Sequence, residues 1–185
     1  FKLHSQGDIQ EAAKYYKYIL DQGIDDFGVF SNYGTILIDF GKLNEAEIYV
    51  RKAIQLKPDF AEGYANLGTI LMDLGKMEEA KIAQTKAIKL KPNLPLSHYN
   101  LGNTLRALGE LDQAELSYKR AISYNSQNSD FYKNLGKLYL HQGDYSSALN
   151  NFIKCFHLQR GSTESNNNYL ESFRKTSKAK IEHDI

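Results

Sequence analysis

The sequence predicts an all-α solenoid, in which helical hairpins stack one after another. Three observations predict this fold: the chain repeats every 34 residues, apolar side chains recur at helical spacing within each repeat, and small residues return at fixed positions. No segment shows the strict alternation of a half-buried β-strand. Because 34 residues suffice for two short helices and their turns, each repeat is expected to be one hairpin.

The repeat can be followed through an Asn-X-Gly motif, which begins at Asn32, Asn66, Asn100 and Asn134. Its phase divides the chain into four complete units and two partial ones. The complete units are 27–60, 61–94, 95–128 and 129–162. We expect 1–26 to be mainly a second helix, and 163–185 to be a partial unit or capping helix with a polar tail. The chain begins at Phe1 rather than Met, so we expect it to be part of a longer protein.

Glycine and proline mark the ends of the predicted helices. A glycine in the left-handed conformation is expected to close the first helix of each complete unit, at Gly41, Gly75, Gly109 and Gly143. The second helix is expected to stop before Pro58 and before Pro92.

The second helices are expected to begin with capping boxes. Asn44 with Glu47, and Asp112 with Glu115, have the spacing that lets a cap side chain and a glutamate satisfy each other's backbone donors.

Small residues within the helices predict close helix packing. Glycine occupies one phase in all four complete units, at Gly34, Gly68, Gly102 and Gly136. A glycine costs a helix roughly 0.5–1 kcal/mol relative to alanine, so its recurrence needs a reason. We expect these glycines to let two helices approach at the short end of the usual interaxial range.

Composition favours a folded, near-neutral protein. Of the 185 residues, 42% are hydrophobic, and 23 basic residues face 22 acidic ones. This balance gives no overall attraction to nucleic acid, and no apolar run approaches the ~18 residues of a membrane span. The single cysteine, Cys155, excludes an internal disulfide and is typical of a reducing compartment. We therefore expect a cytoplasmic protein that binds neither nucleic acid nor membrane.

No catalytic or metal-binding pattern emerges. The five histidines lack metal-ligand spacing with one another or with Cys155, which is expected to be a small buried hydrophobe. The glycines follow the repeat rather than a phosphate-binding loop. We expect no metal, no cofactor and no catalytic activity.

These motifs resemble the tetratricopeptide repeat family. The resemblance rests on Leu-Gly or Tyr-Gly, an apolar residue three positions on, the turn glycine, two alanines seven apart and often a closing proline. Val50 and Gln84 depart from it, because the family usually has an aromatic residue there, as do Ser126 and Arg160 at the closing proline and Leu170 at the glycine. The resemblance implies a right-handed superhelix whose first helices line a concave peptide-binding groove.

One position of the implied groove is always asparagine. It holds Asn32, Asn66, Asn100, Asn134 and Asn168. An amide can both donate to and accept from the backbone of an extended peptide, and the column is similar to that of the O-linked N-acetylglucosamine transferase array. A solvated or locally bonded amide is the alternative.

Charge divides the implied groove into two halves. Units 27–94 contribute Asp39, Glu62 and Asp73 and no basic residue, whereas 95–185 contribute Arg106, Lys133, Lys137, Arg174 and Lys175 against Asp130, Glu164 and Glu171. We expect a partner with an acidic end to bind towards the C-terminal half. The expected contacts there are Arg106, Lys133 and Lys137, with Asn103 beside them. Ordinary solvated charges are the alternative.

The sequence thus predicts a scaffold that binds a peptide or protein segment in its groove. One alternative is the accessory, substrate-recruiting array of a larger enzyme such as a transferase. Another is a self-associating module, and the oligomeric state stays open. RNA-reading helical repeats are less favoured, because the groove is half acidic. A chaperone tail is also less favoured, because Glu164 stands where the family's carboxylate clamp has a lysine.

Overall fold

The computed structural model describes residues 9–160, which form α-helices and no strands. The helices of this part of the chain are α2 (Ile9–Asp21), α3 (Phe27–Asp39), α4 (Leu43–Leu56), α5 (Ala61–Asp73), α6 (Met77–Leu90), α7 (Pro95–Ala107), α8 (Leu111–Tyr124), α9 (Ser129–Gln142) and α10 (Tyr145–Gln159). The all-α class expected from the repeat is confirmed.

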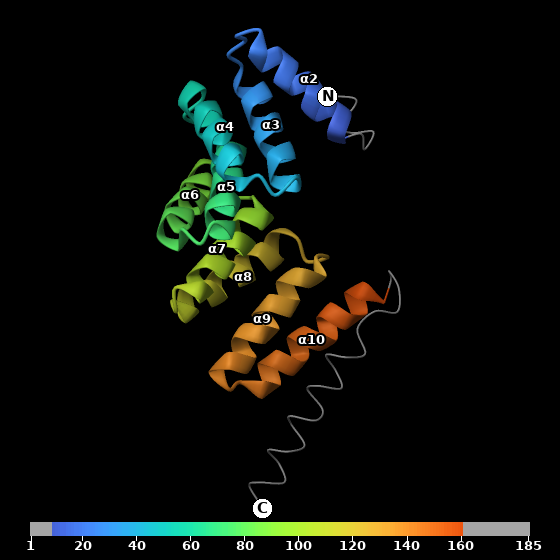
Figure 1. The fold of residues 1–185 in the computed structure, drawn as a ribbon. Coiled ribbons are helices and arrows are strands. Elements are labelled where there is room, and N and C mark those ends of the chain that lie inside the picture. Colours follow the sequence, from blue (N-terminus) through green and yellow to red (C-terminus); the bar gives the residue numbers. More distant parts are fainter. Residues whose placement is uncertain (1–8, 161–185) are drawn as a thin grey trace, which may run out of the picture.

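The helices pair into hairpins that stack in chain order. The most extensive packing joins α3 with α4, α5 with α6, α7 with α8, and α9 with α10. Each hairpin then contacts the next, and α2 packs on α3. The stack follows an arc, and α2 at one end and α10 at the other lie on the same side of it (Figure 1).

The two helices of a hairpin belong to two layers. Along the first layer the backbone of α3 contacts α5, α5 contacts α7, and α7 contacts α9. Within the described residues, no second-layer helix makes such a contact with the next one. In a curved stack the elements lie closest together on the inside of the curve. The layer of α3, α5, α7 and α9 is therefore the inner one, and that of α4, α6, α8 and α10 is the outer one.

The turns form as the sequence predicts. The four turn glycines have φ between 71° and 82°, a left-handed conformation that side chains rarely adopt. Before the two prolines, α4 ends at Leu56 and α6 at Leu90, and the next residue in each case is extended. Such a conformation is the one a following proline favours.

The predicted capping boxes are wrong. Helix α4 already begins at Leu43, with Lys42 as its N-cap and no side-chain cap, so Asn44 lies inside the helix. The reason is the tight turn after Gly41, in which the Lys42 amide donates to the Leu37 carbonyl at 2.8 Å and starts the next helix at once. Asp112 lies inside α8 in the same way. Glu47 instead pairs with Lys76 at 2.8 Å, and Glu115 pairs with Lys119 at 2.6 Å.

The expected close approach at glycine is confirmed. A Cβ atom at Gly102 would lie 2.7 Å from the Tyr118 ring of the same hairpin, closer than carbon atoms pack. In the same phase, Gly68 faces Gln84, and Gly136 faces Phe152. Glycine therefore makes room for the large side chain opposite.

The apolar core consists of two clusters. One runs from α2 to α6 and includes Ile36, Leu37, Ile70 and Leu71; the other lies in α7 to α9 around Tyr118. The boundary between them falls at the α6–α7 interface.

Candidate peptide-binding site

The inner layer carries every described residue that the sequence assigns to the groove. The asparagines lie in the middle of α3, α5, α7 and α9, and all four are half-buried. Arg106 is exposed in the last turn of α7, and Lys137 is exposed on α9. Asn168, Glu164, Glu171, Arg174 and Lys175 lie outside the described residues.

The asparagines tie neighbouring units together. The Asn66 side-chain amide donates to the Thr35 hydroxyl at 3.3 Å, and Asn100 donates to Thr69 at 2.9 Å. Each threonine hydroxyl in turn donates to the carbonyl four residues before it in its own helix. One asparagine donor is thus used within the protein, which gives the column a structural role.

The third unit carries a denser polar network. Asn134 donates to the Asn103 carbonyl oxygen and to the Tyr99 hydroxyl, both at 2.8 Å. The fully buried Tyr118 hydroxyl also donates to Asn103 at 2.8 Å. Burial raises the pKa of Tyr118, and the nearby Arg106 guanidinium opposes the rise. This network brings Asn103, Asn134 and Arg106 together around Tyr118.

The network leaves complementary groups for a ligand. Among the described residues, the side-chain oxygens of Asn66 and Asn100 accept no hydrogen bond, so both can accept from a peptide N–H. Asn103 is the reverse case, because its oxygen accepts two hydrogen bonds and its amino group has no partner in the described chain. The Asn32 side chain makes no hydrogen bond to another described residue.

Three of the predicted groove charges, Lys133, Asp130 and Glu62, are neutralised in ion pairs. Lys133 is paired with Asp130, and this hydrogen bond raises the pKa of Lys133. Glu62 is paired with Lys91 at 2.8 Å, and the hydrogen bond lowers the pKa of Glu62. The charge contrast between the halves is therefore weaker than the sequence suggests, and Lys133 is a poorer anchor than Arg106.

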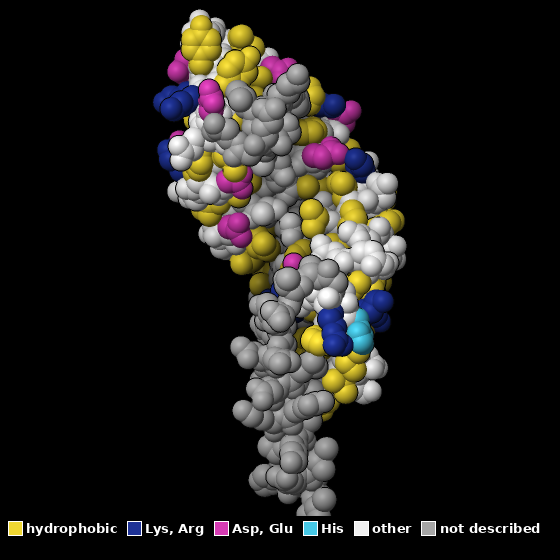
Figure 2. Space-filling view, turned by 90° about the vertical axis from the view of Figure 1, so that its right-hand side faces the viewer, with side chains coloured by type: hydrophobic (Ala, Val, Ile, Leu, Met, Phe, Trp, Pro, Cys, Tyr) yellow, Lys and Arg dark blue, Asp and Glu magenta, His cyan; other side chains and the backbone are white. Residues whose placement is uncertain are grey.

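The remaining acidic residues of the first half lie at helix ends. Asp39 and Asp73 are the last residues of α3 and α5, both exposed, and neither pairs with another described residue. Figure 2 shows acidic side chains spread over the upper part of one face. Lysine and arginine side chains lie at the edges of this upper part too, and in the lower described part they are accompanied by a histidine.

Sequence reasoning missed the partners of the asparagines. Thr35, Thr69 and Tyr99 take part in the ladder although each lies 31 or 35 residues from its asparagine. A hydroxyl or amide recurs three residues after the first three asparagines, at Thr35, Thr69 and Asn103, and this recurrence is the signal that could have revealed them.

Three other features that the sequence raised can be compared with the described residues: metal ligands, membrane spans and the cysteine. They hold no group of three potential metal ligands. None of the described helices has the length and apolar character to span a bilayer. Cys155 is buried as expected, and burial raises the pKa of its thiol.

Comparison with family models finds tetratricopeptide repeats along most of the chain. One tetratricopeptide repeat model matches residues 28–60, 61–94 and 129–162, which together exceed half of the chain. A second matches residues 83–115, and a model described as a TPR repeat matches residues 102–143. Among curated proteins no sequence matches the chain.

Solved structures share the whole fold. A crystal structure of MamA has a TM-score of 0.76 and 26% identity, covering 86% of this chain and 94% of its own. YrrB, titled "a TPR protein with an unusual peptide-binding site", has a TM-score of 0.72 and 20% identity, covering 94% and 87%. TTC0263, a thermophilic TPR protein from Thermus thermophilus, has a TM-score of 0.73 and 22% identity, covering 87% and 88%. Tetratricopeptide arrays typically serve as scaffolds for other proteins. By its family-model matches and its fold, this chain belongs to the tetratricopeptide repeat family.

Proposed function

We propose that this protein binds an extended peptide along the inner layer and has no catalytic activity of its own. The binding surface combines the free oxygens of Asn66 and Asn100 with the basic end at Arg106 and Lys137. The ligand carries an acidic residue or a carboxylate at the end that lies on α7 and α9. The units proposed from the sequence form this surface: 27–60, 61–94, 95–128 and 129–162, between partial units at 1–26 and 163–185.

The single observation that carries the proposal is the hydrogen-bonded asparagine ladder. Each anchored amide is held in place before a ligand arrives, so binding does not have to order it. An amide oxygen recognises a backbone N–H of any sequence, which gives affinity without specificity. Arg106 sets the orientation of the bound peptide. The acidic end of the peptide is attracted to Arg106 and repelled by Asp39 and Asp73, which pair with no other described residue.

Two further points belong to the proposal. The similarity to YrrB, whose title names a peptide-binding site, supports a peptide as the ligand class. The only cysteine in the sequence, Cys155, is a buried free thiol, which supports a reducing compartment, and we propose the cytoplasm.

Peptide selection tests the proposal without a known partner. A displayed library of linear peptides is selected on the full chain, and the best peptide is measured by fluorescence anisotropy against Arg106→Glu. The control is Arg120→Glu, which makes the same charge change at an exposed position of the outer helix α8. We expect selected peptides to share an acidic end and Arg106→Glu to weaken binding about tenfold, the size of one charge-assisted hydrogen bond. Equal losses in the two variants, or peptides without an acidic end, would contradict the proposal.

A further inference from the structure

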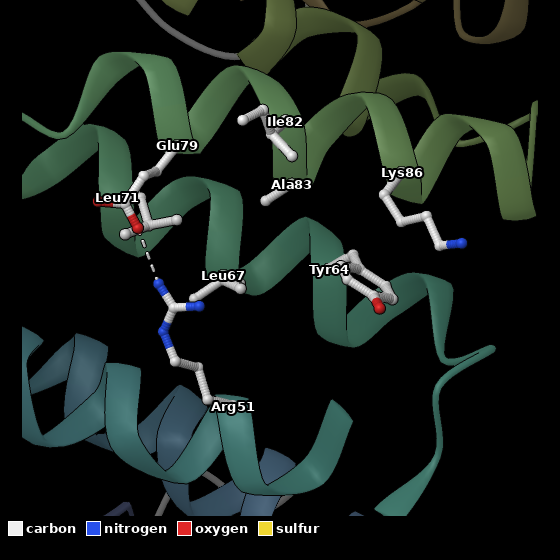
Figure 3. A pocket seen from close by; sticks show the side chains of 8 residues that line it. All are labelled: Arg51, Tyr64, Leu67, Leu71, Glu79, Ile82, Ala83 and Lys86. Atoms are coloured by element: carbon white, nitrogen blue, oxygen red, sulfur yellow. Dashed lines mark hydrogen bonds and ion pairs between the residues drawn. The ribbon is translucent and has the colours of Figure 1, made fainter. Parts of the chain in front are cut away.

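A second concave surface lies on the outer layer, away from the asparagines. It is a cleft of about 400 Å³ between α4 and α6, with α5 as its floor. Its lining residues are Arg51, Tyr64, Leu67, Leu71, Glu79, Ile82, Ala83 and Lys86. Figure 3 shows the Arg51–Glu79 ion pair at one end and Tyr64 with Lys86 at the other.

The cleft lies at a position where the preceding unit has an aromatic ring. Ala83 lines it, and the residue 34 positions earlier, in the preceding unit, is Tyr49. The Tyr49 ring stacks on Phe30 at 6.1 Å between centroids and meets Tyr33 edge-on at 4.9 Å. The counterparts of these two residues in the cleft are Tyr64 and Leu67. The space above them, which Tyr49 fills in one unit, is therefore open in the next.

The lysine that lies beside the Tyr49 ring has a counterpart in the cleft. Lys52 lies 5.6 Å from the Tyr49 ring centroid and 5.4 Å from that of Phe30. Its counterpart Lys86 lies 5.9 Å from the ring of Tyr64 and makes no ion pair with another described residue. An ammonium group held over an aromatic face attracts a second ring at the same place.

Apolar side chains surround the opening. Ile82, on its rim, is 70% exposed, and its counterparts Ile48 and Leu116 in the neighbouring units are 55% and 53% exposed. These three residues form a row across α4, α6 and α8, which we call the outer apolar row. Exposed apolar residues that recur in register beside a cleft are typical of a protein-binding surface.

We propose that the outer cleft binds a tyrosine or phenylalanine side chain of a partner protein, in the position that the Tyr49 ring occupies in the preceding unit. The ring stacks on Tyr64, lies over Leu67 and faces Lys86. Residues flanking it on the partner pack against the outer apolar row. This surface is separate from the inner layer, so an aromatic anchor and an extended peptide can be bound at the same time.

Small amino-acid amides test the site directly. The ¹⁵N-labelled full chain is titrated with N-acetyl-tyrosinamide and with N-acetyl-leucinamide, and the backbone amide shifts are followed. We expect saturable shifts at Tyr64, Ala83 and Lys86 with the tyrosine compound and several-fold weaker binding of the leucine compound. Equal binding of the two, or no shifts at these residues, would overturn the proposal.

The repeat itself supplies matched variants. Lys86→Met is expected to weaken N-acetyl-tyrosinamide binding about three- to fivefold, whereas Lys52→Met, where Tyr49 already fills the space, leaves it unchanged. Ala83→Tyr supplies the missing ring from within the chain and is expected to abolish the shifts. If Ala83→Tyr does not fold, the lysine pair decides. Equal effects of the two lysine variants, or undiminished binding to a folded Ala83→Tyr protein, would show that the cleft is not an aromatic site.

Discussion

At the scale of single residues, Gln84 is the least expected side chain in the core. It is fully buried, and among residues 9–160 neither its amide nitrogen nor its oxygen has a hydrogen-bond partner. The next two units have Tyr118 and Phe152 at this position. The Thr104 hydroxyl on α7 is also buried without a partner. Leaving a buried polar group unpaired costs about 1–3 kcal/mol, so both residues weaken the fold where they lie.

Replacing the glutamine should therefore strengthen the protein. Gln84→Leu removes two unpaired polar atoms and keeps an apolar side chain against Gly68. We expect the free energy of unfolding to rise by about 1–3 kcal/mol, measured by urea denaturation. A lower stability in the leucine variant would show that the buried amide contributes more to folding than an apolar side chain does.

The glycines that face large side chains should not tolerate substitution. In Gly102→Leu the new side chain would collide with the buried Tyr118 ring, and an overpacked core loses about 1–3 kcal/mol or more. Because each unit is stabilised by its neighbours, we expect several units to melt earlier by circular dichroism. Ala107→Leu, at an exposed position on the same helix, serves as the control. An unchanged melting temperature for Gly102→Leu would contradict the close packing.

At the scale of helices, ion pairs join neighbouring hairpins on the outer layer. Glu47 of α4 accepts hydrogen bonds from Lys76, just before α6, and from Arg51, both at 2.8 Å. Lys81 of α6 reaches Glu110, just before α8, in the same manner. The glutamate that the sequence suggests for a capping box thus holds two units together instead.

This arrangement makes part of the stability pH-dependent. The hydrogen bond from Lys76, with a smaller contribution from Arg51, lowers the pKa of Glu47 below its ordinary value of 4.5. The stabilisation is therefore present above about pH 4.5 and is lost as the pH falls through the lowered pKa. We expect Glu47→Gln to cost about 0.5–1 kcal/mol at pH 7 in urea denaturation and nothing near pH 2. A constant difference at both pH values would show that the charge is not responsible.

The helices themselves were predictable because their signals are local. The turn glycines and the two prolines lie next to the helix ends that they set. The capping prediction failed because Asn44 and Asp112 are polar residues near a helix start, and only the conformation of the turn decides which residue becomes the cap. The asparagine ladder and the cleft at Ala83 were not predictable from one unit, since both depend on contacts between units.

At the scale of the whole molecule, the boundary between the two core clusters divides the array. The backbone of α6 contacts that of α7 at least as extensively as α4 contacts α5, so the boundary is not a gap. The two apolar clusters do not join across it, and buried polar side chains lie on both helices: Gln84 on α6, and Ser97, His98 and Thr104 on α7. Burying polar side chains stabilises an interface less than burying apolar ones.

Native-state hydrogen exchange should reveal this division. With rising urea we expect the amides of α2–α6 and those of α7–α10 to become exchangeable in two separate steps, because α2–α6 and α7–α9 have separate apolar clusters and α10 packs on α9. Gln84→Leu is expected to bring the two steps together. Loss of all protection in a single step in the original protein would show that the two clusters unfold as one.

The hydrogen bonds of Asn66, Asn100 and Asn134 also depend on how neighbouring units are oriented. Each joins two units through side chains that the backbone of either unit alone cannot align. If one unit rotates against the next, the donor leaves its acceptor, and the chemical shift of that side-chain NH₂ group changes. The NMR signals of these three groups therefore report on the three interfaces, or joints, between consecutive complete units. They would report, joint by joint, which part of the superhelix winds or unwinds when a partner binds.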